Sequence, residues 1–300
     1  MSELVVGEPA ERTGLRSVRA RGTKARITHV LAYVALLIGA IAFLFPFYYM
    51  VIGSVSPAAD VGRIIPRGLE LANWRFMLSR IPVGRNLLNS AIYSGGIVLS
   101  TLVVGSLTGY ALARLSFYGR SMLFNLILLT LMVPFQLTMI PLYIMVVNFG
   151  WVQPGPRIFL GLIIPGAVNA TAILIFRQFF MQLPQDLFDA ARVDGASDLG
   201  ILVRIALPLS APAFLIAGLL TFIGPWNEFL WPLLVTRDVS WMPLAESVAL
   251  FGVGGQAGGA ASEWGTITAA ATILAIPAVA IFVVFQRYFV QGIATTGLKE

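Results

Sequence analysis

The residues best suited to polar chemistry lie together in one short segment of an otherwise apolar chain. Between residues 183 and 208 the sequence places four aspartates and two arginines: Asp186, Asp189, Arg192, Asp194, Asp198 and Arg204. Carboxylate and guanidinium groups at this density suit charge-assisted contacts with a second surface. The chain has no cysteine and one histidine, His29. Disulfides, thiolate metal sites and cysteine nucleophiles are therefore excluded, and we expect no metal centre.

The local pattern of this segment predicts two short helices joined by a glycine elbow. Pro184 suits the first position of a helix, and Asp186 in the first turn suits the positive end of the helix dipole. Gly195 supplies the residue that many helices need, in a left-handed conformation, just after their last turn. Ser197 can cap a second helix, which we expect to run to about residue 206 and to stop at Pro208.

Two interpretations of this charged segment compete. It could be an amphipathic helix pair lying on the membrane surface, but the anionic inner leaflet would repel four acids. It could instead dock another protein, and the small side chains of Ala190 and Ala191 would permit a close approach. The second interpretation fits the residues better.

The composition places the segment in an integral membrane protein. Of the 300 residues, 58% are hydrophobic and only 11% are charged, with a mean hydropathy of +0.85. A typical soluble domain carries about 25% charged residues, so this chain has too few to cover a solvated surface. No phosphate-binding loop of the G-x-x-x-x-G-K-[ST] type and no hydrolase motif occurs, so we expect no enzymatic activity in this chain.

Six apolar runs are each long enough to cross a bilayer as a helix, which needs about 20 residues. The sequence therefore predicts an all-α membrane protein with six spans, near residues 30–53, 89–113, 122–148, 158–179, 212–234 and 267–289. Prolines that could kink these spans or break them recur along the runs, at Pro46, Pro134, Pro141, Pro165, Pro225, Pro232 and Pro277.

The basic residues predict that both termini lie inside the cell. Six of them precede the first span: Arg12, Arg16, Arg19, Arg21, Lys24 and Arg26. A basic tail could also bind nucleic acid, but a topology signal is the simpler reading, and we expect no nucleic-acid partner. We thus expect a basic tail at 1–29, a six-span domain at 30–290 with the charged segment at 183–208 between spans four and five, and a C-terminal tail at 291–300. The first outer loop is also basic, and its residues 73–77 predict a helix on the membrane surface.

One acid, Glu228, falls within a span. An intramembrane carboxylate is expensive and by default suggests a functional site. Asn227 beside it can donate and accept hydrogen bonds, and Trp226 and Trp231 could stack on sugar rings. These four residues are the candidate substrate path. A structural pairing of Glu228, or a place near the outer interface, is the alternative.

The charged segment resembles the EAA motif of ABC-transporter permeases. The motif residues here are Asp189, Ala190, Ala191, Asp194, Gly195, Ile205, Leu207 and Pro208. Asp189 stands where the family usually has glutamate. Residues 226–232, Trp264-Gly265 and residues 285–292 are similar to the maltose-type, MalG-like carbohydrate-uptake permeases. The first 26 residues lie outside the resemblance.

The resemblance implies partners and a mechanism. The segment 183–208 would dock into a dimeric cytoplasmic ABC ATPase, which binds the ATP and Mg, while this chain itself holds no cofactor. A second, homologous permease would complete the path in the prokaryotic cytoplasmic membrane, and an extracytoplasmic binding protein would deliver a sugar. The outer loop at 250–259, with Gly252, Gly254, Gly255 and Gln256, would contact that binding protein, although an ordinary flexible loop is equally compatible. The last four residues resemble tails that reach the ATPase, although a frayed terminus is equally compatible.

Other classes remain open at this point. An ABC permease for a non-sugar solute would carry the same inner motif. An ion-driven secondary transporter predicts internal repeats and acids in several spans, and the sequence shows neither. A membrane scaffold would not require proline-broken spans.

Overall fold

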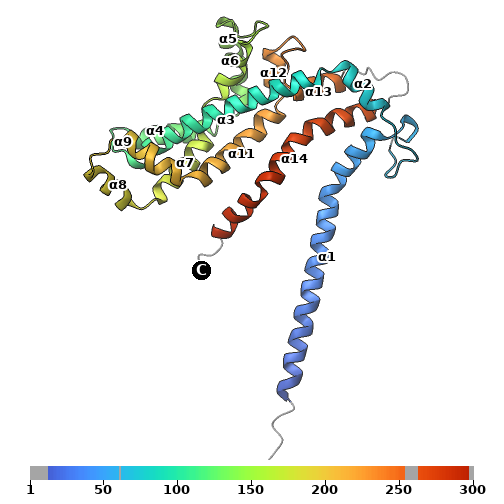
Figure 1. The fold of residues 1–300 in the computed structure, drawn as a ribbon, viewed down its shortest axis with the longest axis horizontal. Coiled ribbons are helices and arrows are strands. Elements are labelled where there is room, and N and C mark those ends of the chain that lie inside the picture. The colour runs from blue at the N-terminus through green and yellow to red at the C-terminus, as the bar shows by residue number, and fades with distance from the viewer. Residues whose placement is uncertain (1–12, 61, 254–262, 297–300) are drawn as a thin grey trace, which may run out of the picture.

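A computed structural model describes the backbone of residues 13–60, 62–253 and 263–296, and the side chains of residues 28–60, 62–252 and 263–286. Within those ranges the chain forms helices and no strand. Figure 1 shows an elongated body built along α3, with α8 and α9 at one end and α2 and α13 at the other. We refer to these as the α8 end and the α13 end.

Three helices form the centre of the body: α3 (Val83–Arg114), α7 (Ala170–Gln182) and α11 (Ala211–Asn227). Small residues on α3 let α7 approach closely, as is common between membrane helices. A Cβ added at Gly109 would lie 2.6 Å from the Cβ of Phe176 and 2.9 Å from the backbone nitrogen of Arg177. Glycine is therefore required there by packing.

The first and last helices stand apart from this centre. Only one end of α1 (Thr13–Val55) meets the body, where it packs on α14 (Glu263–Thr296) and α2 (Ala72–Arg80). The rest of α1 extends away from the body (Figure 1), and its apolar side chains between residues 30 and 47 are largely exposed. Both helices cross the expected domain boundaries: α1 begins within the predicted tail 1–29, and α14 continues past residue 290 to Thr296.

Three helical segments among the described residues are long and apolar enough to span a membrane by themselves: residues 28–55, Val83–Arg114 and residues 263–286. The number rises to six if each bent helix pair counts as one span. The third predicted run is such a pair, because α4 (Arg120–Thr130) and α5 (Phe135–Asn148) meet at 98°. The physical cause is Pro134, which lacks a backbone N–H and takes an extended conformation at the start of α5.

The fourth and fifth predicted runs are also broken. The fourth consists of α6 (Ile158–Ile163), the 3-10 turn η2 (Ile164–Gly166) and α7, with a 49° bend. The fifth consists of α11 and the short helix α12 (Leu230–Val235), which are separated at residues 228–229. Of the candidate proline kinks, Pro46, Pro141, Pro225 and Pro277 lie inside continuous helices.

The predicted helix at 73–77 is present as α2, and one face of it packs into the protein while Arg75 and Leu78 are exposed. The Asn73 side chain is fully buried and donates to the carbonyls of Ser54 and Ser56 at 3.2 and 3.0 Å. Met77 is also fully buried, beneath α13 (Leu244–Val253) and α14. The short helix η1 (Ala58–Asp60) precedes α2.

Candidate functional site

The charged segment forms the predicted helix, elbow and helix at the α8 end of the body. The first helix, α8 (Gln185–Val193), ends in a Schellman motif, in which Gly195 N donates to Arg192 O at 3.0 Å and Ala196 N donates to Ala191 O at 2.9 Å. Gly195 has a φ of +80°, the left-handed conformation that favours glycine. Ser197 then caps α9 (Asp198–Ile201) by accepting from Gly200 N at 3.2 Å.

The second helix does not stop at Pro208, contrary to the expectation from sequence. It continues from α9 through a π-helical stretch, η3 (Leu202–Ala206), into α10 (Leu207–Leu209). The wider π turn places Pro208 in the first turn of α10, where a missing N–H is tolerated. The break falls instead at Ser210, between α10 and α11, where the two helical segments meet at 78°.

The motif residues divide into an inner and an outer set. Ala191 is buried, and Ile205 and Leu207 pack against a core that includes the fully buried rings of Phe176 and Phe188. Outside that core the segment exposes Asp189, Ala190, Asp194 and Pro208. Exposed apolar side chains lie on the same element, namely Leu187, Val193, Leu199 and Val203. An apolar surface mixed with acids is thus presented on a rigidly packed base.

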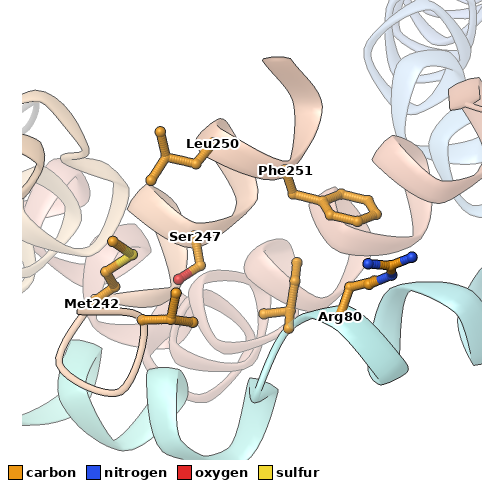
Figure 2. Close-up of a pocket in the computed structure, with 7 residues that line it drawn as sticks. Arg80, Met242, Ser247, Leu250 and Phe251 are labelled. Atoms are coloured by element: carbon orange, nitrogen blue, oxygen red, sulfur yellow. The ribbon is translucent and has the colours of Figure 1, made fainter. Parts of the chain in front are cut away.

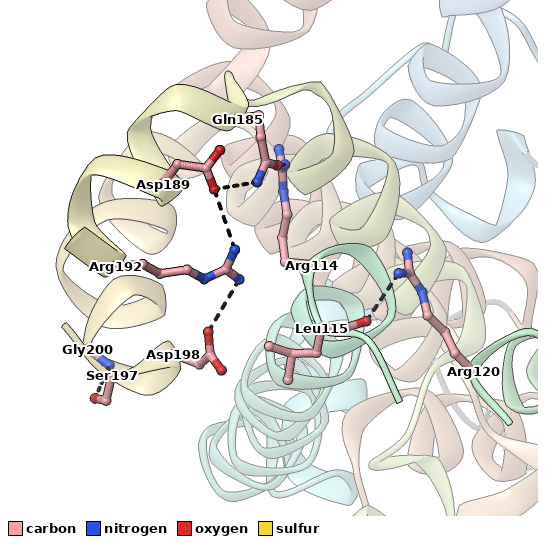
Figure 3. A network of polar contacts seen from close by, with 9 residues as sticks. All are labelled: Arg114, Leu115, Arg120, Gln185, Asp189, Arg192, Ser197, Asp198 and Gly200. Carbon is pink, nitrogen blue, oxygen red and sulfur yellow. Dashed lines mark hydrogen bonds and ion pairs between the residues drawn. The ribbon is translucent and has the colours of Figure 1, made fainter. Parts of the chain in front are cut away.

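A polar network ties the two helices of the elbow together, as Figure 3 shows. The guanidinium of Arg192 lies 3.6 Å from Asp189 on α8 and 3.5 Å from Asp198 on α9. Gln185 donates to the other side of this network, to Asp189 at 2.9 Å. All of these groups are exposed, so each ion pair contributes at most about 1 kcal/mol. Asp189 is therefore partly engaged within the chain.

Arg114, the last residue of α3, links this segment to the rest of the body, and no sequence motif marks it. Its Nε donates to Phe180 O at 2.9 Å and its Nη2 donates to the carbonyls of Phe180 and Leu183, which closes the C-terminal end of α7. Its Nη1 donates to Gln185 Oε1 at 2.6 Å, and its guanidinium carbon lies 4.1 Å from the centre of the Phe188 ring. One side chain at the end of α3 thus holds both α7 and α8.

The second candidate region is a cavity of about 400 Å³ between α3, α5, η2, α11 and α12. Two of the four residues proposed for a substrate path line it, Glu228 and Trp231. The other two do not. Trp226 is buried and donates from Nε1 to Leu274 O of α14 at 3.0 Å, and Asn227 is exposed and donates to Ile223 O at 2.9 Å. The sequence pattern does not indicate that the helix breaks at residues 228–229, directly after Trp226 and Asn227.

Glu228 occupies this helix break. Its Oε1 accepts from the backbone nitrogens of Leu230 at 2.8 Å and Trp231 at 3.4 Å, which caps α12. Trp231 is held in turn by a bond from Nε1 to Gly161 O at 3.2 Å. The carboxyl group is therefore a structural cap and a cavity-lining group at once.

A third region lies at the α13 end. A pocket of about 300 Å³ opens between the end of α2 and α13, and Figure 2 shows Arg80, Met242 and Phe251 around it. Of the residues expected in a flexible loop, Gly252 instead lies within α13. Gly254, Gly255 and Gln256 lie outside the described residues.

Glu246 of α13 is a further buried acid, and it is not among the candidate residues expected from the sequence. It is fully buried, and Thr236 Oγ1 lies 2.6 Å from both of its oxygens. Burial raises the pKa of Glu246 to about 7, and the Thr236 bond offsets this only in part. A single acid within the apolar run at 242–253 is the sequence signal that could have found it. No cluster of residues suited to a metal ion occurs in the described part of the chain.

Comparisons with known proteins agree with this architecture. Over 266 residues, 31% are identical to the arabinooligosaccharides transport system permease protein AraQ of Bacillus subtilis, covering 86% of this chain and 91% of the relative. The sn-glycerol-3-phosphate transport system permease protein UgpE of Yersinia enterocolitica is 32% identical over 277 residues, with 88% and 95% covered.

A solved structure shares the fold. The crystal structure of a bacterial ABC transporter involved in the import of the acidic polysaccharide alginate contains a chain with a TM-score of 0.77 and 25% identity, covering 89% of this chain and 98% of that one. The model of the family described as "Binding-protein-dependent transport system inner membrane component" matches residues 101–295. The chain therefore belongs to the family of inner membrane components of binding-protein-dependent transport systems.

Proposed function

We propose that this chain forms one transmembrane half of an ATP-driven saccharide importer. Its family membership supports the transport role, and the exposed face of α8 and α9 carries the proposed coupling. In this arrangement a second, homologous permease completes the path, and a dimeric cytoplasmic ATPase binds ATP and Mg. The chain performs no catalysis itself, and it transmits force through residues 183–208.

The proposed topology has six spans with both termini inside a prokaryotic cytoplasmic membrane. The bent pairs provide enough apolar helix for six crossings, and the basic residues before α1 favour an inner N-terminus. This orientation puts the α8 end inside and the α13 end outside. The pocket beside Arg80 and Phe251 then faces an extracytoplasmic binding protein.

The coupling role rests on how the segment is built. Phe188, Ala191 and Ile201 anchor it in the core, so a push on its outer face is carried into α7 and α11. Arg114 extends that path to α3. The exposed Leu187, Val193 and Leu199 supply apolar area for an ATPase groove, and the acids around them supply charge.

The substrate class rests on the cavity and the relatives. Aromatic rings, uncharged polar groups and one carboxyl group around a cavity of about 400 Å³ suit saccharide binding. One relative is named for arabinooligosaccharides and another for sn-glycerol-3-phosphate, so a phosphorylated non-sugar solute is the second candidate.

Purification from native membranes in mild detergent tests this proposal. We expect mass spectrometry to identify an ABC ATPase and a second permease with the chain. In proteoliposomes, the complex should accumulate a saccharide only when ATP and the binding protein are both present. Transport by the isolated chain under an ion gradient, without an ATPase, would contradict the proposal.

A further inference from the structure

We propose that the cavity beside Glu228 is a saccharide subsite contributed by this chain, and that Glu228 selects neutral over anionic saccharides there. The inference rests on the proposed import function and narrows its substrate class. It is carried by the shape, the polar groups and the charge of the cavity lining.

The aromatic part of the lining is held in place by the protein. Trp231 is almost fully buried, its indole N–H is bound to Gly161 O, and its ring meets Phe135 edge to face with centroids 5.8 Å apart. Tyr93 of α3 lines the same cavity. Trp231 and Tyr93 expose only 2% and 3% of their area, so they form the packed wall of the cavity. Phe135 also lines the cavity and is 37% exposed, so its ring offers the aromatic face that can meet the apolar face of a sugar.

The polar part of the lining has capacity left for a ligand. Asn169 uses its Oδ1 to cap α7, accepting from Ala172 N at 3.1 Å, so its amide NH2 remains available. Gln136 lines the cavity, and no side-chain hydrogen bond to it occurs among the described residues. Glu228 uses Oε1 to cap α12, while Oε2 has no such bond within the described part of the chain. The cavity therefore offers the hydroxyl groups of a saccharide a donor in Asn169, an amide that can both donate and accept in Gln136, and an acceptor in Glu228.

The charge of the lining decides between ligand classes. Glu228 is the one ionisable acid that lines the cavity, and no lysine, arginine or histidine lines it among the described residues. A carboxylate accepts hydrogen bonds from sugar hydroxyl groups, and such bonds are stronger than neutral ones. It repels a uronate or a phosphate, and inside the protein water screens that repulsion only weakly. A site made for an anionic ligand would instead present arginine or lysine.

The test compares ligands that differ mainly in charge. The complete complex, in lipid nanodiscs and without its binding protein, is assayed by scintillation proximity with labelled arabinotriose, galactotriose and trigalacturonate. We expect the wild type to bind at least one neutral trisaccharide at least tenfold more tightly than trigalacturonate. Glu228→Gln keeps the acceptor that caps α12 but loses the charge, and it should reduce this preference by about tenfold.

Two further variants separate selectivity from folding. Glu228→Asp keeps the charge and should keep the preference even where affinity falls. Asn227→Ala changes the neighbouring exposed residue outside the cavity, and its preference should match the wild type. Three outcomes would overturn the subsite while leaving the import function standing. They are an unchanged preference in Glu228→Gln, a preference of the wild type for trigalacturonate, and no saccharide binding by a complex that nevertheless imports saccharide. Absence of ATP-dependent import by the wild-type complex would contradict the proposed function itself.

Discussion

The elbow at Gly195 permits a quantitative prediction about coupling. The residue has a φ of +80°, and a Cβ added there would meet no atom within 4 Å. Alanine at this position therefore introduces backbone strain without a clash, and the left-handed conformation costs a residue with a Cβ about 1–2 kcal/mol. Because the elbow is exposed, the free segment can relax, and docking must restore the strained shape.

Gly195→Ala should then weaken docking to the ATPase by about 5- to 30-fold, since about 1.4 kcal/mol corresponds to tenfold. Asparagine tolerates the left-handed region better, so Gly195→Asn should lie between alanine and the wild type. The assay is titration of purified ATPase against permease pairs in nanodiscs, followed by ATP-dependent uptake. Gly195→Asp adds charge as well and should uncouple transport without changing the affinity of the binding protein for sugar. Equal docking by glycine and alanine, or weaker docking by asparagine than by alanine, would refute the reasoning.

Three other predictions follow from single contacts. Arg114→Gln removes the hydrogen bonds to α7 and α8, so the amount of saccharide imported per ATP hydrolysed should fall about tenfold. Arg114→Lys should recover part of this ratio. An unchanged ratio in the glutamine variant would contradict the proposed link between α3 and α8. Gly109→Ala should lower the free energy of unfolding by about 1–3 kcal/mol in a thermal assay, whereas Gly95→Ala on the same helix, where a Cβ meets nothing within 4 Å, should not. Burial raises the pKa of Glu246 from 4.5 to about 7, so the folded protein holds a proton on Glu246 that the unfolded chain has lost. The free energy of unfolding should therefore fall by up to about 3 kcal/mol as the pH rises from 4.5 to about 7. Glu246→Gln should remove that slope, and a slope retained in the variant would assign the titration to another group.

The elbow could be predicted from sequence because it depends on local chemistry. A left-handed glycine, a serine cap and an acid in the first turn act within four residues of one another, and the structure shows each of them at Gly195, Ser197 and Asp198. Pro208 was misread because a π-helical stretch ahead of it changes what a proline does. The residue types of Leu202–Ala206 do not distinguish a π-helical stretch from an α-helix.

The remaining differences depend on contacts between distant segments. Arg114 belongs to no sequence motif, and its partners Phe180 and Leu183 come much later in the chain, so only the fold reveals its role. Trp226 and Glu228 are two positions apart and form one group by sequence, but the helix break at Glu228 directs Trp226 toward α14 and Glu228 into the cavity. Only the fold separates a packing tryptophan from a cavity-lining one.

Crosslinking from α8 tests the central claim most directly. The chain contains no cysteine, so Val193→Cys creates a single thiol, and Val193 is 88% exposed on the proposed coupling surface. A photoreactive maleimide at this thiol should crosslink the ATPase subunit in the assembled, importing complex, and the yield should change on adding ATP. The same label at Leu250→Cys, on α13, should not reach the ATPase. Crosslinking of the α13 label to the ATPase, or of the α8 label only to lipid or to the binding protein, would contradict the account.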